Sequence, residues 1–167
     1  IPQMNESVYE LSYYPRTQLK WDRNGKIPGG LWTGKVLPAY VTQEYFNNQR
    51  PQMFTIGIST GAQGAIKFGF LNPDLKGAIG ISGTYSIMNL PPGDGEYNLH
   101  ALVLGQRTFQ TWPQEDITSQ VKRINFPVTV LSEFNSGYTQ LTRNFWNYAH
   151  QQLKMQNIDG STKLVQP

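Results

Sequence analysis

The chain has 167 residues, of which 38% are hydrophobic and 15% are charged, a composition typical of one folded domain and not of a disordered chain. Its formal net charge of +3 comes from 14 basic against 11 acidic residues without any run of Lys or Arg, which argues against nucleic-acid binding. The sequence contains no cysteine, which excludes disulfides, thiolate zinc sites and a cysteine nucleophile.

The first third of the sequence predicts a strand, a loop and a helix. Residues 8–14 alternate and are rich in side chains of high β-propensity, which predicts a strand that stops at Pro15. Residues 15–30 contain Asn-Gly and Gly-Gly pairs, which are typical of a loop. From residue 31 to residue 46 the apolar side chains recur at mostly helical spacing, so we expect a helix that Pro38 kinks or shifts.

The central stretch predicts a strand, a helix and a second strand. Residues 53–56 form a short apolar run that Gly57 ends. Residues 61–71 form a helix rich in small side chains, and residues 77–82 form a second buried strand. The three elements together span about 30 residues, the length of the β-α-β unit from which parallel sheets are built.

The last part of the chain predicts an insertion followed by elements of the same α/β pattern. Residues 86–117 are rich in turns and are expected to lie over a face of the sheet as an insertion. Trp112, Tyr85 and Tyr97 are expected to pack this part of the chain, with an aromatic substrate pocket as the alternative. Further along, we expect a short helix over 116–123 capped by Glu115-Asp116, a strand over 127–131, the longest helix over 139–156 and the start of a strand over 163–165.

The elements therefore predict a single domain over residues 1–167, of the α/β class with a mainly parallel sheet and flanking helices. No apolar stretch approaches the roughly 20 residues of a membrane span, so none is expected. No signal peptide is recognisable, and the chain opens on Ile1 instead of Met, which indicates a processed, trimmed or partial sequence.

The pentapeptide Gly57-Ile58-Ser59-Thr60-Gly61 carries the most specific chemical signal. It matches G-x-S-x-G between a predicted strand and a predicted helix, the setting of a nucleophile elbow. Glycines at Gly57 and Gly61 remove Cβ atoms from a turn whose flanking chains nearly touch, and Ser59 is expected at strained backbone angles. The Thr60 N–H, at the start of the helix, is the expected oxyanion donor. The alternative is a glycine-rich turn with a passive serine.

Several motifs in a fixed order strengthen the first interpretation. They are Lys35-Val36-Leu37-Pro38-Ala39-Tyr40-Val41, Phe54 to Gly64, Leu71-Asn72-Pro73-Asp74-Leu75 and Ile81-Ser82-Gly83-Thr84. In this order they resemble the esterase family of α/β-hydrolases that includes S-formylglutathione hydrolase, feruloyl esterases, siderophore esterases and mycolyltransferases. The resemblance covers residues 31–85 well and 105–158 loosely. It implies an α/β-hydrolase fold without its amino-terminal strands, Ser59 as nucleophile and a small-molecule carboxylic ester as substrate.

The catalytic partners of Ser59 are harder to find. A nucleophilic serine needs a base, and the base needs an orienting carboxylate. The resemblance implies an acid near residues 134–136, where Glu133 is the nearest carboxylate, and a histidine beyond Pro167. We therefore expect a further segment or a second chain to complete the site. Within the sequence, His100 in the insertion is the better candidate base and His150 the weaker one.

The sequence thus leaves three hypotheses open. The first is a serine esterase that acts through a Ser59 acyl-enzyme. The second is a catalytically inactive esterase-like domain used for binding, since the acid and base are missing. The third is a generic α/β scaffold with a chance pentapeptide. No cofactor is expected, and two histidines so far apart in the sequence offer no metal-ligand spacing.

Overall fold

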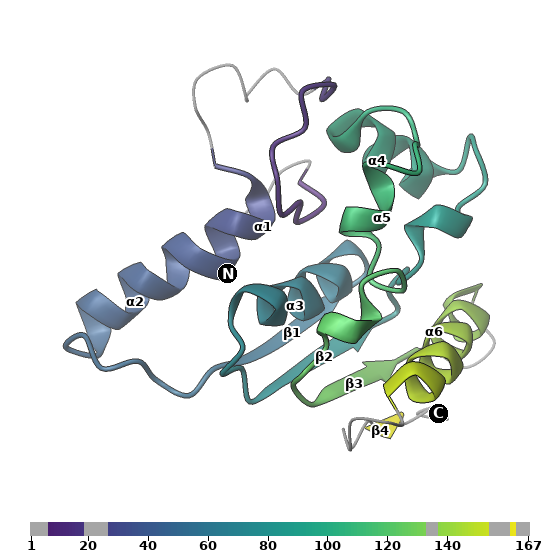
Figure 1. The fold of residues 1–167 in the computed structure, drawn as a ribbon. Helices are drawn as coiled ribbons and strands as arrows, with labels where there is room; N and C mark the ends of the chain where they lie inside the picture. Colours follow the sequence, from purple (N-terminus) through teal and green to yellow (C-terminus); the bar gives the residue numbers. More distant parts are fainter. Residues whose placement is uncertain (1–6, 19–26, 133–136, 154–160, 163–167) are drawn as a thin grey trace.

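The computed structural model describes residues 7–18, 27–132, 137–153 and 161–162, and Figure 1 shows its fold. Helices and strands alternate along much of the chain, as in other α/β proteins. The elements in chain order are α1 (Gly29–Leu31), the π-helix η2 (Trp32–Val36), α2 (Leu37–Tyr45), β1 (Phe54–Ile58), α3 (Thr60–Leu71), β2 (Gly77–Ile81), the 3-10 helix η3 (Ile87–Asn89), α4 (Gly95–Leu104), α5 (Trp112–Glu115), the 3-10 helix η4 (Val121–Arg123), β3 (Val128–Leu131), α6 (Gly137–Leu153) and β4 (Ser161–Thr162).

The four strands form one parallel sheet in the order β1-β2-β3-β4. Strands that follow one another in the sequence therefore lie side by side, with Ile58 of β1 opposite Ile81 of β2. The helix α3 connects β1 to β2, which confirms the predicted β-α-β unit. β1 continues to Ile58, past Gly57, because the strand ends only where the chain turns into the helix.

One face of the sheet carries the main hydrophobic core. α3 packs across β1 and β2 on this face (Figure 1), and the Thr55 hydroxyl donates a hydrogen bond of 2.8 Å to the Ala65 carbonyl oxygen. Tyr85 stacks on Phe145 of α6 in the same core, with ring centroids 4.5 Å apart. The buried members of this cluster are Ala62, Ile66, Leu75, Ala78, Tyr85, Ile117, Val121, Ile124, Phe126, Val130, Phe145 and Ala149.

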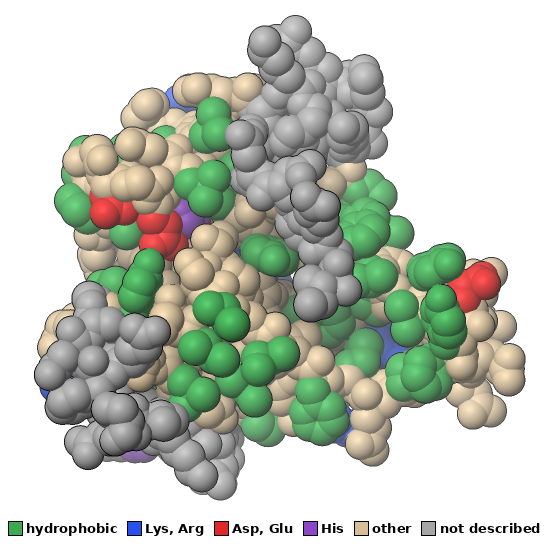
Figure 2. Space-filling view, turned by 180° about the vertical axis from the view of Figure 1, so that it is seen from behind, with side chains coloured by type: hydrophobic (Ala, Val, Ile, Leu, Met, Phe, Trp, Pro, Cys, Tyr) green, Lys and Arg blue, Asp and Glu red, His purple; other side chains and the backbone are tan. Residues whose placement is uncertain are grey.

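None of the described helices covers the opposite face of the sheet at β1. Phe54, Ile56 and Ile58 of β1 are 69%, 68% and 67% exposed, and Ile79 of β2 is 36% exposed. Figure 2, seen from this side, shows hydrophobic side chains gathered over the middle of the molecule. Because parallel sheets are usually covered on both faces, the described helices supply only one of the two layers that such a sheet requires.

A second hydrophobic cluster joins the amino-terminal segment, residues 7–18, to the part of the chain predicted as an insertion. Trp112 is fully buried there, and its Nε1 donates to the Gly105 carbonyl oxygen at 3.0 Å. Trp112 therefore packs the insertion as predicted, with the Tyr97 ring beside it, whereas Tyr85 packs in the main core against Phe145. The buried members of this cluster are Val8, Tyr14, Ile87, Leu90, Ala101, Val103, Leu104 and Trp112.

Two of the predicted elements are wrong. Residues 8–14 form no strand, because their polar groups bind partners outside a sheet ladder. The Glu10 carboxylate accepts from the Ser7 hydroxyl, the Val8 N–H and the distant Gly29 N–H, and the Leu11 N–H donates to Glu115. Residues 116–123 form no single helix. The Asp116 carboxylate accepts from both the N–H and the hydroxyl of Ser119 at 2.6 Å, and a turn stands between α5 and η4.

The helix predicted over residues 31–46 is present but begins earlier and is irregular. The chain is helical from Gly29 to Tyr45, with a π-helical segment in η2. Pro38 lies in the first turn of α2, directly after this segment. Since proline has no N–H and its ring collides with the preceding turn, a wider turn before it accommodates the side chain without ending the helix.

The carboxy-terminal predictions are confirmed in part. β3 and α6 correspond to the strand predicted over 127–131 and the helix predicted over 139–156. Residues 154–156 and the strand predicted over 163–165 lie outside the described residues. The short strand β4 pairs with β3 just before that position, with Ser161 opposite Thr129.

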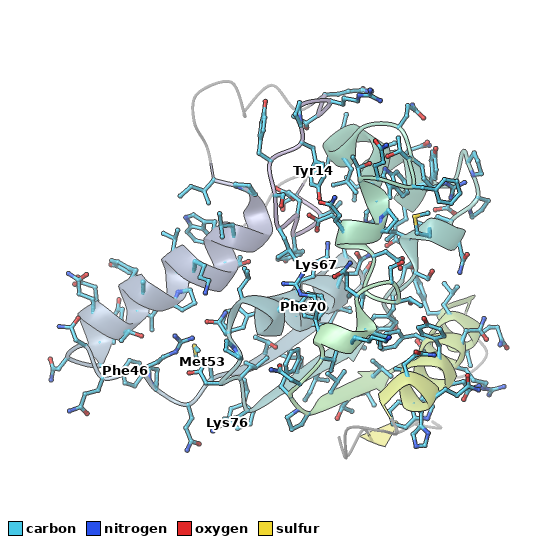
Figure 3. All side chains as sticks on the ribbon, viewed as in Figure 1. Tyr14, Phe46, Met53, Lys67, Phe70 and Lys76 are labelled. Atoms are coloured by element: carbon cyan, nitrogen blue, oxygen red, sulfur yellow. The ribbon has the colours of Figure 1, made fainter. Side chains whose placement is uncertain are left out.

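A buried ion pair connects the two hydrophobic clusters. Lys67 of α3 and Glu115 of α5 lie 2.8 Å apart, with side chains 1% and 0% exposed. Glu115 also accepts hydrogen bonds from the Tyr14 hydroxyl at 2.6 Å and the Leu11 N–H at 2.8 Å. Figure 3 shows Tyr14 and Lys67 directed toward each other from the amino-terminal segment and from α3. The pair therefore fastens the amino-terminal segment to α3, the helix that follows Ser59.

Replacing Lys67 by Met should lower the free energy of unfolding by about 3–5 kcal/mol, because it leaves the Glu115 carboxylate buried without its counter-ion. The measurement is urea denaturation of the purified protein, with Lys76→Met at an exposed position of the same chain as the matched control. Equal midpoints for the two variants would contradict the assignment.

Candidate active site

Ser59 occupies a sharp turn between β1 and α3. Its backbone angles are φ 55° and ψ −127°, a region that non-glycine residues rarely adopt. The Ser59 N–H donates to the Ile81 carbonyl oxygen of β2 at 2.9 Å, and the Ser59 carbonyl oxygen accepts from the Ala62 N–H at 2.9 Å. The side chain is exposed. A serine at positive φ in a sharp turn from a strand into a helix is the backbone geometry that the predicted nucleophile elbow requires.

The two glycines of the pentapeptide have different roles. A Cβ on Gly57 would lie 1.8 Å from the carbonyl oxygen of Gly61, so no other residue fits where β1 and α3 meet. A Cβ on Gly61 would have only the Tyr9 hydroxyl nearby, at an ordinary 3.8 Å. The prediction that a Cβ atom would collide in this turn therefore holds for Gly57 and not for Gly61. Gly61 contributes to the close contact through its backbone carbonyl oxygen, which lies against Gly57.

The first turn of α3 offers hydrogen-bond donors beside Ser59. Thr60 is the first residue of the helix, and no acidic side chain stands in that turn. The first N–H groups of a helix have no partner inside the helix, and the helix dipole favours negative charge near them. The Thr60 N–H is thus suited to hold an oxyanion formed next to Ser59.

The structure does not bring His100 to Ser59. Its ring is fully buried in α4, with Nδ1 2.9 Å from the Glu96 carbonyl oxygen and Nε2 3.3 Å from Oε1 of Gln63. Burial lowers the pKa of His100 to about 4, so the ring is neutral at pH 7. A neutral imidazole has a single N–H and donates to only one of these two acceptor oxygens. The buried ring makes no hydrogen bond to Ser59 in the described part of the chain, so it is not placed to act as the base.

His100 belongs instead to a polar cluster that joins α4 to α3. Gln63 of α3 donates to Glu96 Oε1 at 3.0 Å, and the Thr84 hydroxyl donates to Glu96 Oε2 at 2.6 Å. Burial raises the pKa of Glu96, and its hydrogen bonds to Thr84 and Gln63 oppose that shift. The cluster holds the insertion against the first turns of α3, one helical turn beyond Ser59.

The other predicted base, His150, makes no hydrogen bond to Ser59 in the described part of the chain. His150 is exposed on α6, with its ring 5.6 Å from that of Trp146. Glu133 lies outside the described residues, directly after Ser132. Among the residues that the structure describes, no three His, Asp or Glu side chains are grouped as a metal site, and no helix is long and apolar enough to cross a membrane.

Tyr9 lies at the site although nothing in the sequence pattern singled it out. A Cβ on Gly64 would be 2.5 Å from Cγ of its ring, so the ring covers α3 where the helix lacks a side chain. The two glycines on one side of α3, Gly61 and Gly64, are a signal that a large group packs there. The two glycines do not reveal that the large group is Tyr9, because Tyr9 lies more than 50 residues earlier in the sequence.

The strand, the strained serine and the glycine-lined helix start together define the α/β-hydrolase class of fold. No family model and no curated protein matches the sequence. Solved structures do match. They include S-formylglutathione hydrolase from Agrobacterium tumefaciens, with a TM-score of 0.63, 17% identity, and coverage of 83% of this chain and 48% of that one.

Two further matches are MPT51 of Mycobacterium tuberculosis and a ferulic acid esterase. MPT51 has a TM-score of 0.70 and 16% identity, over 95% of this chain and 64% of that one. The ferulic acid esterase has a TM-score of 0.54 and 15% identity, over 83% and 53%. The chain thus spans about half to two thirds of the length of these structures. The predicted α/β-hydrolase fold, and the predicted resemblance in fold, are confirmed.

Gly57→Ala should lower the free energy of unfolding by roughly 3 kcal/mol or more, because the added Cβ overlaps the Gly61 carbonyl oxygen. Gly61→Ala is the matched variant, since its Cβ meets only the Tyr9 hydroxyl at 3.8 Å, and it should change stability far less. Thermal or urea unfolding of both proteins measures the difference. Similar losses in the two variants would show that the elbow is not closed in this way.

Stability should fall as the pH is lowered from about 6.5 to about 4. The unfolded chain binds a proton at His100 in this range and the folded protein does not, because burial lowers the pKa of that ring to about 4. The loss should reach about 3 kcal/mol. Urea midpoints against pH should become flatter in His100→Gln, whereas His150→Gln, at an exposed position, should keep the wild-type slope.

Proposed function

We propose that the protein is a serine esterase that cleaves a small-molecule carboxylic ester through an acyl-enzyme on Ser59. The observation that carries the proposal is that Ser59, held at φ 55°, is exposed at the start of α3, in a turn that Gly57 and Gly61 close by direct backbone contact. Strain of this kind costs about 1–3 kcal/mol and is found mainly at functional sites. The similarity in fold to S-formylglutathione hydrolase and a ferulic acid esterase supports the same chemistry.

The reaction follows from the geometry of the elbow. Ser59 Oγ attacks the ester carbonyl carbon, and the carbonyl π electrons move onto the oxygen, which the Thr60 N–H holds. The Oγ proton passes to a base, and the same proton later reaches the leaving alcohol as the carbon–oxygen bond of the ester breaks. Water then repeats the sequence on the acyl-enzyme and releases the acid. None of these steps requires a cofactor.

The base and its orienting acid must come from outside the described residues. The His100 ring is buried against Glu96 and Gln63, and His150 lies exposed on α6. We therefore assign the base to a further segment of the polypeptide or to a second chain, with Glu133 as the candidate acid. The chain covers about half of the S-formylglutathione hydrolase structure, which is consistent with a site completed by additional residues.

A second candidate function is a binding domain that has lost catalysis. The engagement of His100 by Gln63 and Glu96 favours it, because the histidine of the insertion serves packing. In this case the Ser59 hydroxyl is not required, and Ser59→Ala should leave binding intact.

A fluorophosphonate probe separates the two functions, because it labels only serines that are activated as nucleophiles. The full-length protein should acquire one adduct on Ser59, mapped by mass spectrometry of its peptides. Ser59→Ala should abolish the adduct. Ser82→Ala is the matched control, since Ser82 directly follows the neighbouring strand at φ 47° and should not be labelled. Absence of any adduct on the wild-type protein would contradict the esterase and leave the binding domain.

A further inference from the structure

Tyr9 lies along the first turns of α3 and points toward the elbow. A Cβ on Gly64 would be 2.5–2.8 Å from Cγ, Cδ1 and Cδ2 of the Tyr9 ring, whereas a Cβ on Gly61 would be 3.8 Å from the Tyr9 hydroxyl. The near end of the ring is therefore beside Gly64 and the hydroxyl beside Gly61. Because Gly61 is closer to the start of α3 than Gly64, the side chain runs toward the helix start, where Ser59 stands.

The backbone around Tyr9 is fixed on both sides. Glu10 accepts from the Gly29 N–H through its side chain at 2.6 Å and from the Gly30 N–H through its carbonyl oxygen at 2.9 Å. On the other side, the fully buried Val8 has its carbonyl oxygen 3.4 Å from Lys67 Nζ of α3. These contacts tie the segment to α1 and to α3, so the position of the Tyr9 ring does not depend on the ring alone.

Tyr9 is also strained. Its φ is 54°, which for a bulky side chain is a clear departure from the usual range. Among the described residues, the other non-glycine residues at positive φ are Asn47 and Asn48 after α2, and Ser59 and Ser82 at the ends of β1 and β2. Asparagine tolerates this region well, whereas tyrosine does not. Strain of this kind is kept where the surrounding structure needs the side chain in one place.

The Tyr9 hydroxyl is available as a hydrogen-bond donor. No hydrogen bond of this hydroxyl to another residue is found in the part of the chain that the structure describes. Half-burial raises the pKa of the phenol above its ordinary value of 10.0, so the group keeps its proton at neutral and mildly alkaline pH. A protonated donor held in place beside a nucleophilic serine is the kind of group that stabilises an oxyanion.

We propose that the Tyr9 hydroxyl is a catalytic donor that stabilises the oxyanion beside the Thr60 N–H, an inference that rests on the proposed esterase function. When the bond between Ser59 Oγ and the carbonyl carbon forms, the π electrons move onto the acyl oxygen, which then accepts hydrogen bonds from both groups. The Oγ proton leaves to the base, and Tyr9 keeps its own proton throughout. Such a contact strengthens as charge develops and so acts on the transition state more than on the bound substrate.

The experiment compares Tyr9→Phe with the wild-type protein in full-length form. Phenylalanine keeps the ring against Gly64 and removes only the hydroxyl, so the thermal midpoint should stay unchanged. Hydrolysis of p-nitrophenyl acetate, corrected with Ser59→Ala, gives kcat and KM. Loss of one oxyanion donor should lower kcat by roughly 100-fold and leave KM nearly unchanged. Tyr13→Phe, at a side chain 57% exposed in the same segment, is the matched control and should behave as wild type.

The outcomes distinguish this inference from the function on which it rests. An active wild-type protein with an equally active Tyr9→Phe variant would overturn the role of Tyr9 and leave the Ser59 esterase intact. A loss confined to KM would also overturn it, because it would mean uniform binding and not transition-state stabilisation. A wild-type protein with neither turnover nor a Ser59 adduct overturns the proposed function and this inference together.

Discussion

The buried pair of Lys67 and Glu115 determines how the parts of this molecule meet. Two charges taken out of water are tolerated only when hydrogen bonds occupy their remaining positions, and Glu115 receives three donors, from Lys67, Tyr14 and Leu11. Lys67 belongs to α3 and Glu115 to α5, so the pair joins the helix at the elbow to the insertion. Because its other donors come from the amino-terminal segment, that segment has to lie on α3 as well. The position of Tyr9 beside the elbow is a consequence of this arrangement.

The sequence predicts best those features whose causes are local. The apolar run of β1, the small residues of α3 and the glycines of the elbow lie within 20 residues of one another, and both the parallel unit and its strained serine follow from them. The strand predicted over 8–14 fails for the opposite reason. Its alternation is real, but Glu10 binds the N–H of Gly29 and Leu11 binds Glu115, partners that no short window contains. The sequence predicts Glu115 as a helix cap. The structure buries it against Lys67, a partner 48 residues earlier in the sequence that local patterns do not reveal.

The same distinction explains the two faces of β1. On the face toward α3, β1 presents only the Thr55 side chain and the bare backbone of Gly57, and α3 places Ala62 in the core. Strand and helix therefore approach closely enough for Gly57 to touch Gly61. The large side chains Phe54, Ile56 and Ile58 all point to the other face, where the described residues provide no cover. The two faces of this short apolar strand therefore differ in what they contact. On one face the strand lies close against α3. On the other face it exposes large hydrophobic side chains, although a parallel sheet is normally buried on both sides.

Ser59 and Ser82 share a strained backbone, so this strain by itself does not indicate a reactive serine. Ser59 and Ser82 both stand one residue beyond the end of a strand at positive φ, and each donates its N–H to the last residue of the next strand, Ile81 or Leu131. The sheet ladder thus supports the strained conformation at both positions, whether or not chemistry takes place there. A strained serine by itself marks the fold. What makes Ser59 different from Ser82 is its surroundings: the open first turn of α3 and the Tyr9 hydroxyl directed along it. The proposed activity accordingly depends on groups that long-range contacts bring to Ser59, and the pentapeptide alone does not reveal these groups.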